Sequence, residues 1–128
     1  MSESRRSYIE MEDATAKTFE KQLSSARVSI VDFWAPWCTP CIRLSEMMKE
    51  AFAEIGDAYD GKINCLKVNV DEEQELARKF GIMSLPTVIG FVGSNPVERF
   101  TGRTKDDFLK WVDRLADIGG LLEEKEEE

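Results

Sequence analysis

A short and almost continuous apolar run, Val28–Trp34, places the strongest constraint on how this chain can fold. A run of this kind is typical of a strand that is buried on both faces of a sheet. Such a strand needs helices on both sides, and an amphipathic helix follows it after a short loop. The apolar residues of that helix recur at i, i+3, i+4 and i+7, and they are Leu44, Met47, Met48, Ala51, Phe52 and Ile55.

The rest of the chain alternates in the same way between strand patterns and helix patterns. We expect an edge strand near residues 8–11, a helix over 14–24, a strand over 63–70, a short helix ending at Gly81, strands over 87–92 and 97–101 joined by a turn at 93–96, and a last helix ending at Gly119. A capping box is expected for Asp71 with Gln74, and Thr104 and Asp107 are expected to cap the last helix. The order βαβαβαββα predicts an α/β fold in which helices flank a central mixed sheet.

The length and charge of the chain bound its organisation and its partners. At 128 residues it is long enough for one domain with a substantial core, which we place at residues 1–122. Residues 123–128 hold five acids and one lysine, so we expect a frayed acidic tail, with an interaction tail as the alternative. The net charge of −8 argues against nucleic acid or an anionic membrane surface as a partner. Because no apolar run resembles a membrane span or a signal peptide, we expect a cytoplasmic protein.

Two cysteines separated by two residues lie between the apolar strand and the helix that follows it, in the segment Cys38-Thr39-Pro40-Cys41. A helix N-terminus presents unpaired N–H groups and a partial positive charge, which favours a thiolate over a thiol. The thiolate is the form of cysteine that attacks disulfides. Pro40 suits the first helical turn, where its missing N–H leaves no hydrogen bond unmade. The segment therefore predicts a redox centre, because its two thiols can close into a disulfide and reopen.

Two other interpretations of the cysteine pair remain open. A structural zinc or an iron–sulfur cluster needs about four Cys or His ligands, whereas the chain has three cysteines and no histidine. A carboxylate or a second chain could complete such a ligand set. A purely structural disulfide is the other alternative, although its loop is too short to constrain the unfolded chain strongly. We expect no metal and no cofactor.

The helical spacing assigns different roles to the two thiols. Cys41 lies three residues before Leu44 and seven before Met48, so it continues the buried stripe, whereas Cys38 lies at the mouth of the helix. We therefore expect Cys38 to be the exposed nucleophile and Cys41 to be the sheltered thiol that resolves the mixed disulfide. The third cysteine, Cys65, lies in a strand pattern and should behave as a buried apolar residue.

Asp32 interrupts the apolar run, on the same face as Ile30 and Trp34. Burial of a carboxylate raises its pKa and is costly without a partner. Asp32 is either a satisfied polar group at the end of the strand or a proton acceptor and donor for the Cys41 thiol. The second role suits a chain without histidine, which needs a tuned group for acid–base work near neutral pH. Lys67, in the next predicted strand, pairs with Asp32 if the strands are neighbours and is otherwise an exposed lysine.

Taken together, these residues resemble the thioredoxin family. The segment 34–41 reads WAPWCTPC and is similar to the family motif WAxWCGPC. Asp32 matches the buried aspartate of the family, and Lys67 matches its paired lysine. Leu85-Pro86-Thr87 resembles the stretch that holds a cis-proline beside the active site, so we expect a cis peptide bond before Pro86. Gly102 matches the glycine that lines the substrate groove of the family.

The resemblance extends from about Tyr8 to Leu115 and implies a thioredoxin fold. It also implies a protein-disulfide reductase, a monomer in our interpretation, that a thioredoxin reductase recycles. The implied catalytic residues are Cys38, Cys41, Asp32 and Lys67. The implied substrate-binding residues are Trp37, Thr39, Pro40, Leu85, Pro86 and Gly102.

The chain departs from the family pattern at three places. Thr39 stands where the family has a glycine between the cysteines, at a position that tunes the redox potential. Ser45-Glu46 occupies the region where the active-site helix commonly carries a proline, so a kink is not implied. Gly90 breaks the apolar run of its strand, and the sequence does not explain it.

Two alternatives to a reductase follow from these observations. One is a disulfide oxidase or isomerase with a less reducing pair, which the missing histidine between the cysteines and the missing secretion signal disfavour. The other is a thioredoxin-fold binding module whose CxxC is incidental. The presence of Asp32, Trp37 and Pro86 disfavours the binding module.

Overall fold

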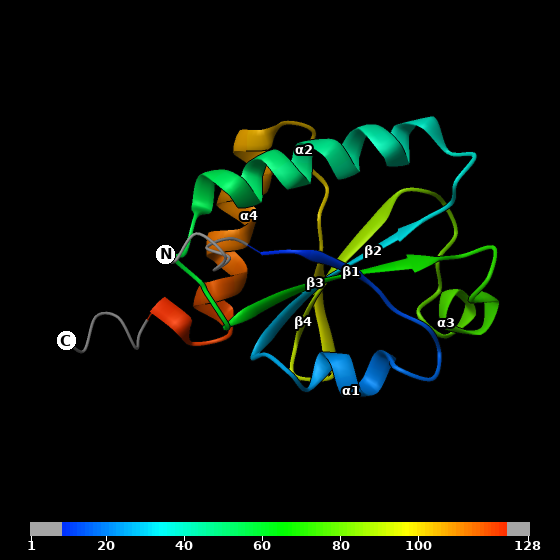
Figure 1. The fold of residues 1–128 in the computed structure, drawn as a ribbon, viewed down its shortest axis with the longest axis horizontal. Helices are drawn as coiled ribbons and strands as arrows, with labels where there is room; N and C mark the ends of the chain where they lie inside the picture. Colours follow the sequence, from blue (N-terminus) through cyan, green and yellow to red (C-terminus); the bar gives the residue numbers. More distant parts are fainter. Residues whose placement is uncertain (1–8, 123–128) are drawn as a thin grey trace, which may run out of the picture.

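The computed structural model describes residues 9–122, and the elements follow in the expected order βαβαβαββα (Figure 1). They are β1 (Met11–Asp13), α1 (Phe19–Leu23), β2 (Val28–Trp34), α2 (Thr39–Ile55), β3 (Ile63–Asn69), α3 (Gln74–Lys79), β4 (Thr87–Val92), β5 (Asn95–Arg99) and α4 (Lys105–Ile118). The expected acidic tail, 123–128, and Tyr8 of the expected first strand lie outside the described residues.

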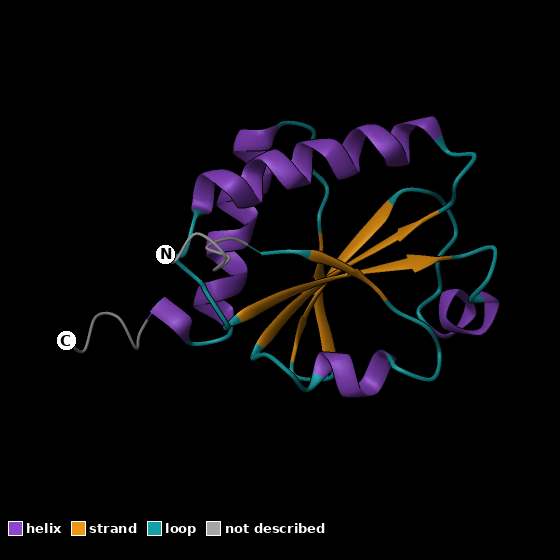
Figure 2. Ribbon diagram, in the orientation of Figure 1, coloured by secondary structure: helices purple, strands orange, loops and turns teal. Residues whose placement is uncertain are grey.

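The strands form one mixed sheet in the order β1-β3-β2-β4-β5 (Figure 2). β2 lies at the centre, parallel to β3 and antiparallel to β4. Its register places Asp32 opposite Lys67 on one side and Val88 on the other. β1 extends the parallel part, and β5 forms a hairpin with β4 at the opposite edge. The predicted mixed sheet with flanking helices is confirmed.

Helices cover both faces of the sheet, as the apolar run of β2 requires (Figure 1). α2 and α4 pack over Ile30 on one face, where Phe52 and Phe108 meet edge to face between the two helices. α1 and α3 cover the other face, around Phe33 and Phe19. The central strand is therefore enclosed on both sides, and the loop that leaves its carboxyl end starts from a rigid base.

Gly90, which the sequence leaves unexplained, allows α4 to pack closely on β4. A Cβ atom at this position would lie 2.5–2.6 Å from the two methyl carbons of Leu115, a residue of α4 with no exposed surface. The pairing of β4 with β5 also shifts register between Gly90 and Phe91. Helix packing thus accounts for the break in the apolar run.

One of the two expected helix caps forms, and it is a capping box. The Thr104 hydroxyl accepts a hydrogen bond from the backbone N–H of Asp107 at 3.0 Å, and the Asp107 carboxylate accepts one from the backbone N–H of Thr104 at 3.1 Å. The expected box at the start of α3 is wrong, because the helix begins at Gln74 itself. The Asp71 carboxylate instead accepts a hydrogen bond from the indole of Trp37.

Several element boundaries differ from the sequence expectations. The first strand begins at Met11, and the expected helix 14–24 shortens to α1 because 15–18 forms a turn closed by the Thr15 and Thr18 hydroxyls. The hairpin turn contains only Gly93 and Ser94, so β5 begins two residues earlier than expected. Gly93 has φ +60°, a conformation that glycine adopts without strain, and the edge strand accommodates the proline that follows the turn.

Candidate redox-active site

The loop between β2 and α2 brings Cys38 and Cys41 together as a disulfide, with their Cα atoms 5.2 Å apart. Cys38 is the N-cap residue of α2, and its Sγ accepts a hydrogen bond from the backbone N–H of Cys41 at 3.2 Å. Pro40 lies in the first turn of this helix, as expected. The Cys38 sulfur thus lies at the positive end of a long helix, which stabilises a thiolate once the disulfide is reduced.

The two cysteines differ in their surroundings more than in their exposure. Cys38 is 5% exposed and Cys41 is 1% exposed, so the expectation of a clearly exposed Cys38 is wrong. Cys38 is covered because it packs with Ala35 and Cys41 in a small cluster, against which the partly buried Trp34, Val70 and Leu85 lie. It nevertheless lines an open groove, whereas Cys41 lines a separate, smaller cavity.

The groove beside Cys38, here called the tryptophan groove, has a volume of about 650 Å³. Four of the expected substrate-binding residues, Trp37, Thr39, Pro40 and Leu85, line it together with Val70, Ala77, Ile82, Met83 and Ser84. Residues from three separate stretches of the chain therefore meet next to the reactive sulfur.

Two side chains give the tryptophan groove an exposed apolar rim. Trp37 is 69% exposed, and its indole Nε1 donates a hydrogen bond to Asp71 at 3.1 Å, which fixes the orientation of the ring. Met83 is 92% exposed. Sequence reasoning missed both Asp71 and Met83 as site residues, and the only signal for Met83 is its position two residues before Leu85.

The other two expected groove residues, Pro86 and Gly102, line a second groove of about 670 Å³, here called the arginine groove. The peptide bond between Leu85 and Pro86 is cis, as expected. The remaining lining residues are Pro40, Arg43, Leu44, Met47, Val88, Phe100 and Arg103. The single groove that the resemblance implies is thus two adjoining grooves that share Pro40.

Gly102 is required by packing in the arginine groove. A Cβ atom at this position would lie 2.5 Å from the Asp107 Cβ and 2.8 Å from a ring carbon of Phe100. Any side chain would therefore displace the first turn of α4 or the aromatic wall of the groove.

Asp32 has no exposed surface, and neither of its carboxylate oxygens has a hydrogen-bond partner among the described residues. It is therefore not the satisfied polar group of the alternative interpretation. Burial raises the pKa of Asp32 to about 7, and the positive charge of Lys67 opposes this rise. Asp32 and Cys41 line the same cavity, of about 180 Å³. A group that titrates near neutral pH thus faces the cavity of the sheltered thiol.

Lys67 lies opposite Asp32 in the sheet, but the two side chains form no hydrogen bond. The ammonium nitrogen of Lys67 instead lies 4.2 Å from the centroid of the Trp34 ring, in a cation–π contact. The two strands are neighbours, as the pairing of Lys67 with Asp32 requires, but no hydrogen bond joins the two side chains. Lys67 affects Asp32 through its electrostatic field.

The remaining walls of the Asp32 cavity come mainly from α2, which is continuous through the region where the family commonly has a proline. Ser45, Glu46 and Lys49 contribute polar side chains to this cavity. Ser45 is largely buried, four residues after Cys41. Its place on the buried stripe of the helix is the sequence signal that could have identified it.

Cys65 takes no part in either groove. It is 1% exposed at the centre of β3, between Met11 of β1 and Ile30 of β2. Burial raises the pKa of its thiol well above the usual range. The expectation that it behaves as a buried apolar residue is confirmed.

Within residues 9–122, no group of three or more His, Cys, Asp or Glu side chains could hold a metal ion. In the same range no helix is long and apolar enough to cross a bilayer.

Comparison with known proteins gives one consistent result. The family model described as Thioredoxin matches residues 10–114. Thioredoxin from Staphylococcus saprophyticus is 42% identical over 101 residues, which cover 78% of this chain and 92% of that protein. Thioredoxin from Alicyclobacillus acidocaldarius is 38% identical over 104 residues, covering 81% of this chain and 93% of that protein.

A solved structure supports the same conclusion about the fold. A mutant thioredoxin from Halobacterium salinarum NRC-1 superposes with a TM-score of 0.70 at 29% identity. The superposition covers 83% of this chain and 90% of that chain. The predicted fold is therefore confirmed.

Proposed function

Because this chain belongs to the thioredoxin family, we propose that it reduces disulfides in other proteins and is re-reduced by a thioredoxin reductase. It is a dithiol oxidoreductase of the thioredoxin type, with the CTPC sequence at its active site. The observation that carries the proposal is the position of the disulfide: Cys38 borders an open groove, whereas Cys41 shares a cavity with a buried acid.

In the first step, the Cys38 thiolate attacks one sulfur of a substrate disulfide. A bond forms between Cys38 and that sulfur, the substrate disulfide breaks, and the leaving thiolate takes a proton from solvent. The N-terminus of α2 and the backbone N–H of Cys41 support this role, because both stabilise negative charge on the Cys38 sulfur.

In the second step, Cys41 loses its proton to the Asp32 carboxylate and attacks the Cys38 sulfur. The Cys38–Cys41 bond forms and the mixed disulfide breaks, so that a second substrate thiolate leaves and is protonated. Two electrons have then passed from the two thiols to the substrate, whose two thiolates have each taken a proton from solvent, while Asp32 holds the proton of Cys41 until it returns that proton to solvent. Asp32 suits this role because its pKa of about 7 lets it accept and return a proton near neutral pH.

Lys67 tunes this exchange in our proposal. Its charge lowers the pKa of Asp32 and so opposes the larger effect of burial. The cation–π contact with Trp34 holds that charge beside the cavity, which Lys67 also lines.

The substrate segment lies across the two grooves in the same proposal. The tryptophan groove, with Trp37, Thr39, Pro40 and Leu85, faces one side of the reactive sulfur. The arginine groove, with Pro86 and Gly102, lies beside it. Exposed apolar surface at Trp37 and Met83 supports binding of another protein chain here.

We also propose that residues 1–122 form one domain, because the two core clusters lie on opposite faces of one sheet. A cytoplasmic location is part of the same proposal, since the S. saprophyticus relative is a thioredoxin and reducing chemistry requires a reducing compartment.

An oxidase or isomerase remains the second candidate, since Thr39 stands between the cysteines at the position that tunes the potential. The equilibrium potential of the Cys38/Cys41 pair against glutathione separates the two functions. A reductant is expected near about −270 mV, and a value of about −180 to −120 mV would contradict the proposal.

The variant Cys41→Ser tests the order of the two thiols. With an oxidised substrate protein it should accumulate a mixed disulfide that dithiothreitol dissolves, because serine cannot displace the substrate from Cys38. Cys38→Ser is the matched control and should trap little, since Cys41 is 1% exposed and lines only the smaller cavity. Equal trapping by both variants on a non-reducing gel would overturn the assignment.

A further inference from the structure

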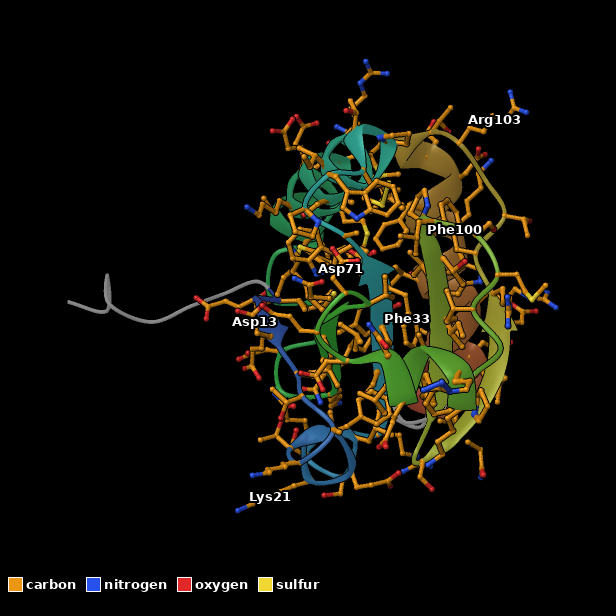
Figure 3. The ribbon with its side chains drawn as sticks, turned by 90° about the vertical axis from the view of Figure 1, so that its right-hand side faces the viewer. Asp13, Lys21, Phe33, Asp71, Phe100 and Arg103 are labelled. Carbon is orange, nitrogen blue, oxygen red and sulfur yellow. A yellow bond between two sulfur atoms is a disulfide. The ribbon has the colours of Figure 1, made fainter. Side chains whose placement is uncertain are left out.

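Two arginines line the arginine groove. Arg43 comes from the exposed side of α2, and Arg103 from the loop that leads into α4. Figure 3 views the end of the molecule at which α2 begins, and Arg103 lies at its outer edge. Both side chains are exposed, whereas Leu44, Met47 and Val88 give the groove apolar walls.

Neither guanidinium is paired with an acid among the described residues. Some other cations in residues 9–122 do have such partners: Lys105 pairs with Glu54, and Arg114 pairs with Glu98. The carboxylate nearest in sequence to Arg103, that of Asp107, caps α4 by accepting hydrogen bonds from the backbone N–H groups of Arg103 and Thr104.

The unpaired cations contrast with the charge of the whole chain, which is −8. Because acidic residues outnumber basic ones, the chain has enough carboxylates to pair with its surface cations. Two free guanidiniums beside one groove therefore offer a binding site for an acidic group from outside the chain.

The position of this groove connects it with the reaction. It shares Pro40 with the tryptophan groove and is also lined by Pro86. A substrate segment whose cysteine reaches Cys38 can place one neighbouring side chain in the tryptophan groove and another in the arginine groove.

We infer that this oxidoreductase prefers protein disulfides flanked by acidic side chains, which Arg43 and Arg103 bind in the arginine groove. The inference rests on the proposed function and adds a substrate class to it. An aspartate or glutamate carboxylate accepts paired hydrogen bonds from a guanidinium, and its alkyl stem packs against the apolar walls. The pairing strengthens binding of the substrate and leaves the thiol chemistry unchanged.

The expected effect is modest and sensitive to salt, because both arginines are exposed. A peptide with glutamate next to its cysteines should be reduced about three- to tenfold faster, in kcat/KM, than the same peptide with lysine at low ionic strength. The ratio should approach one at about 0.5 M salt.

The test uses disulfide peptides that are identical except for Glu, Gln or Lys on either side of each cysteine. The glutamate-to-lysine ratio of kcat/KM is measured for the wild type and for the double variant Arg43→Glu/Arg103→Glu. The ratio should invert in the variant. A matched control, Lys17→Glu/Lys21→Glu, changes the net charge equally but on exposed residues at or beside α1, and Lys21 lies far from Arg103 in Figure 3.

The outcomes separate the inference from the proposed function. A control variant that also inverts the ratio, or a wild type that reduces the Gln peptide without any preference between Glu and Lys, overturns the inference alone. A wild type that reduces none of the peptides overturns the proposed function and the inference with it.

Discussion

At the scale of single residues, Asp32 is the group whose properties depend most on the fold around it. Its carboxylate has no hydrogen-bond partner among the described residues, and burial raises its pKa to about 7. The same burial that makes the charged form costly makes the group useful, because it can then hold or release a proton at neutral pH. Stability and reactivity therefore respond in opposite directions to its removal.

Replacing Asp32 with asparagine should slow disulfide turnover by about ten- to a hundredfold at pH 7, because Cys41 loses its proton acceptor. The rate of the wild type should rise with pH around 7, as the carboxylate deprotonates, and this rise should disappear in the variant. Single-turnover reduction of a disulfide substrate over pH 6–8 measures both effects. Identical pH profiles would show that Asp32 has only a structural role.

The same substitution should stabilise the oxidised protein, and the gain should depend on pH. The pKa of Asp32 is about 7 in the folded state and about 3.9 in an unfolded chain, so the folded state binds more protons between these values. The free energy of unfolding of the wild type therefore falls as pH rises from about 4 to 7, by up to about 4 kcal/mol. The advantage of Asp32→Asn should widen over that window and then stay constant. Urea unfolding at pH 4.5, 6 and 8 measures it, and a gain that is independent of pH would contradict the assignment.

Sequence reasoning identified the cysteines and Asp32 because each breaks or extends a pattern along one element. It missed Arg43, Arg103 and the hydrogen bond between Trp37 and Asp71, since these depend on how separate elements meet. It left open whether Lys67 pairs with Asp32 or is an exposed lysine, and only the family resemblance implied the pair. It could not foresee that the ammonium lies over the Trp34 ring.

At the scale of elements, β4 and α4 fit together only because Gly90 lacks a side chain. The variant Gly90→Ala should lower the free energy of unfolding by about 1–3 kcal/mol, since the new Cβ would lie 2.5–2.6 Å from the Leu115 methyl carbons. Chemical denaturation measures this loss.

A double-mutant cycle isolates the cause of that loss. The background Leu115→Ala removes the atoms that the added methyl group would meet, so Gly90→Ala should cost much less there, although the background itself is destabilised. An equal cost in both backgrounds would show that the backbone of β4, and not the packing of α4, requires glycine.

Element types were predictable where the apolar pattern is strong, as in the continuous run of β2 and the helical periodicity of α2 and α4. Boundaries were less predictable where side chains compete with the backbone. The turn closed by Thr15 and Thr18 shortens α1, and the engagement of Asp71 by Trp37 leaves α3 without its expected cap. The first contact is local and competes with the helix for the same backbone groups, whereas the second joins residues that are 34 positions apart in the chain.

At the scale of the whole molecule, Cys65 reports on the stability of the sheet. It lies at the centre of β3 with β1 and β2 on either side, so an alkylating agent should reach it only after the strands separate. In the reduced protein, Cys38 should react first with iodoacetamide, and Cys65 at least about a thousandfold more slowly.

The urea dependence of that slow reaction should match the dependence of global unfolding. Mass mapping after timed alkylation provides the measurement. Rapid modification of Cys65 in native buffer would mean that the edge strand β1 opens independently of the rest of the sheet.

The disulfide also separates the surface that we propose binds other proteins from the cavity that holds the acid. No residue that lines the tryptophan or arginine groove also lines the cavity of Asp32 and Cys41. Mutations in one set can therefore accumulate without disturbing the other. Substitutions in the two grooves can therefore change which substrate proteins are bound while the chemistry of the thiols stays unchanged. This holds both for natural evolution and for protein design.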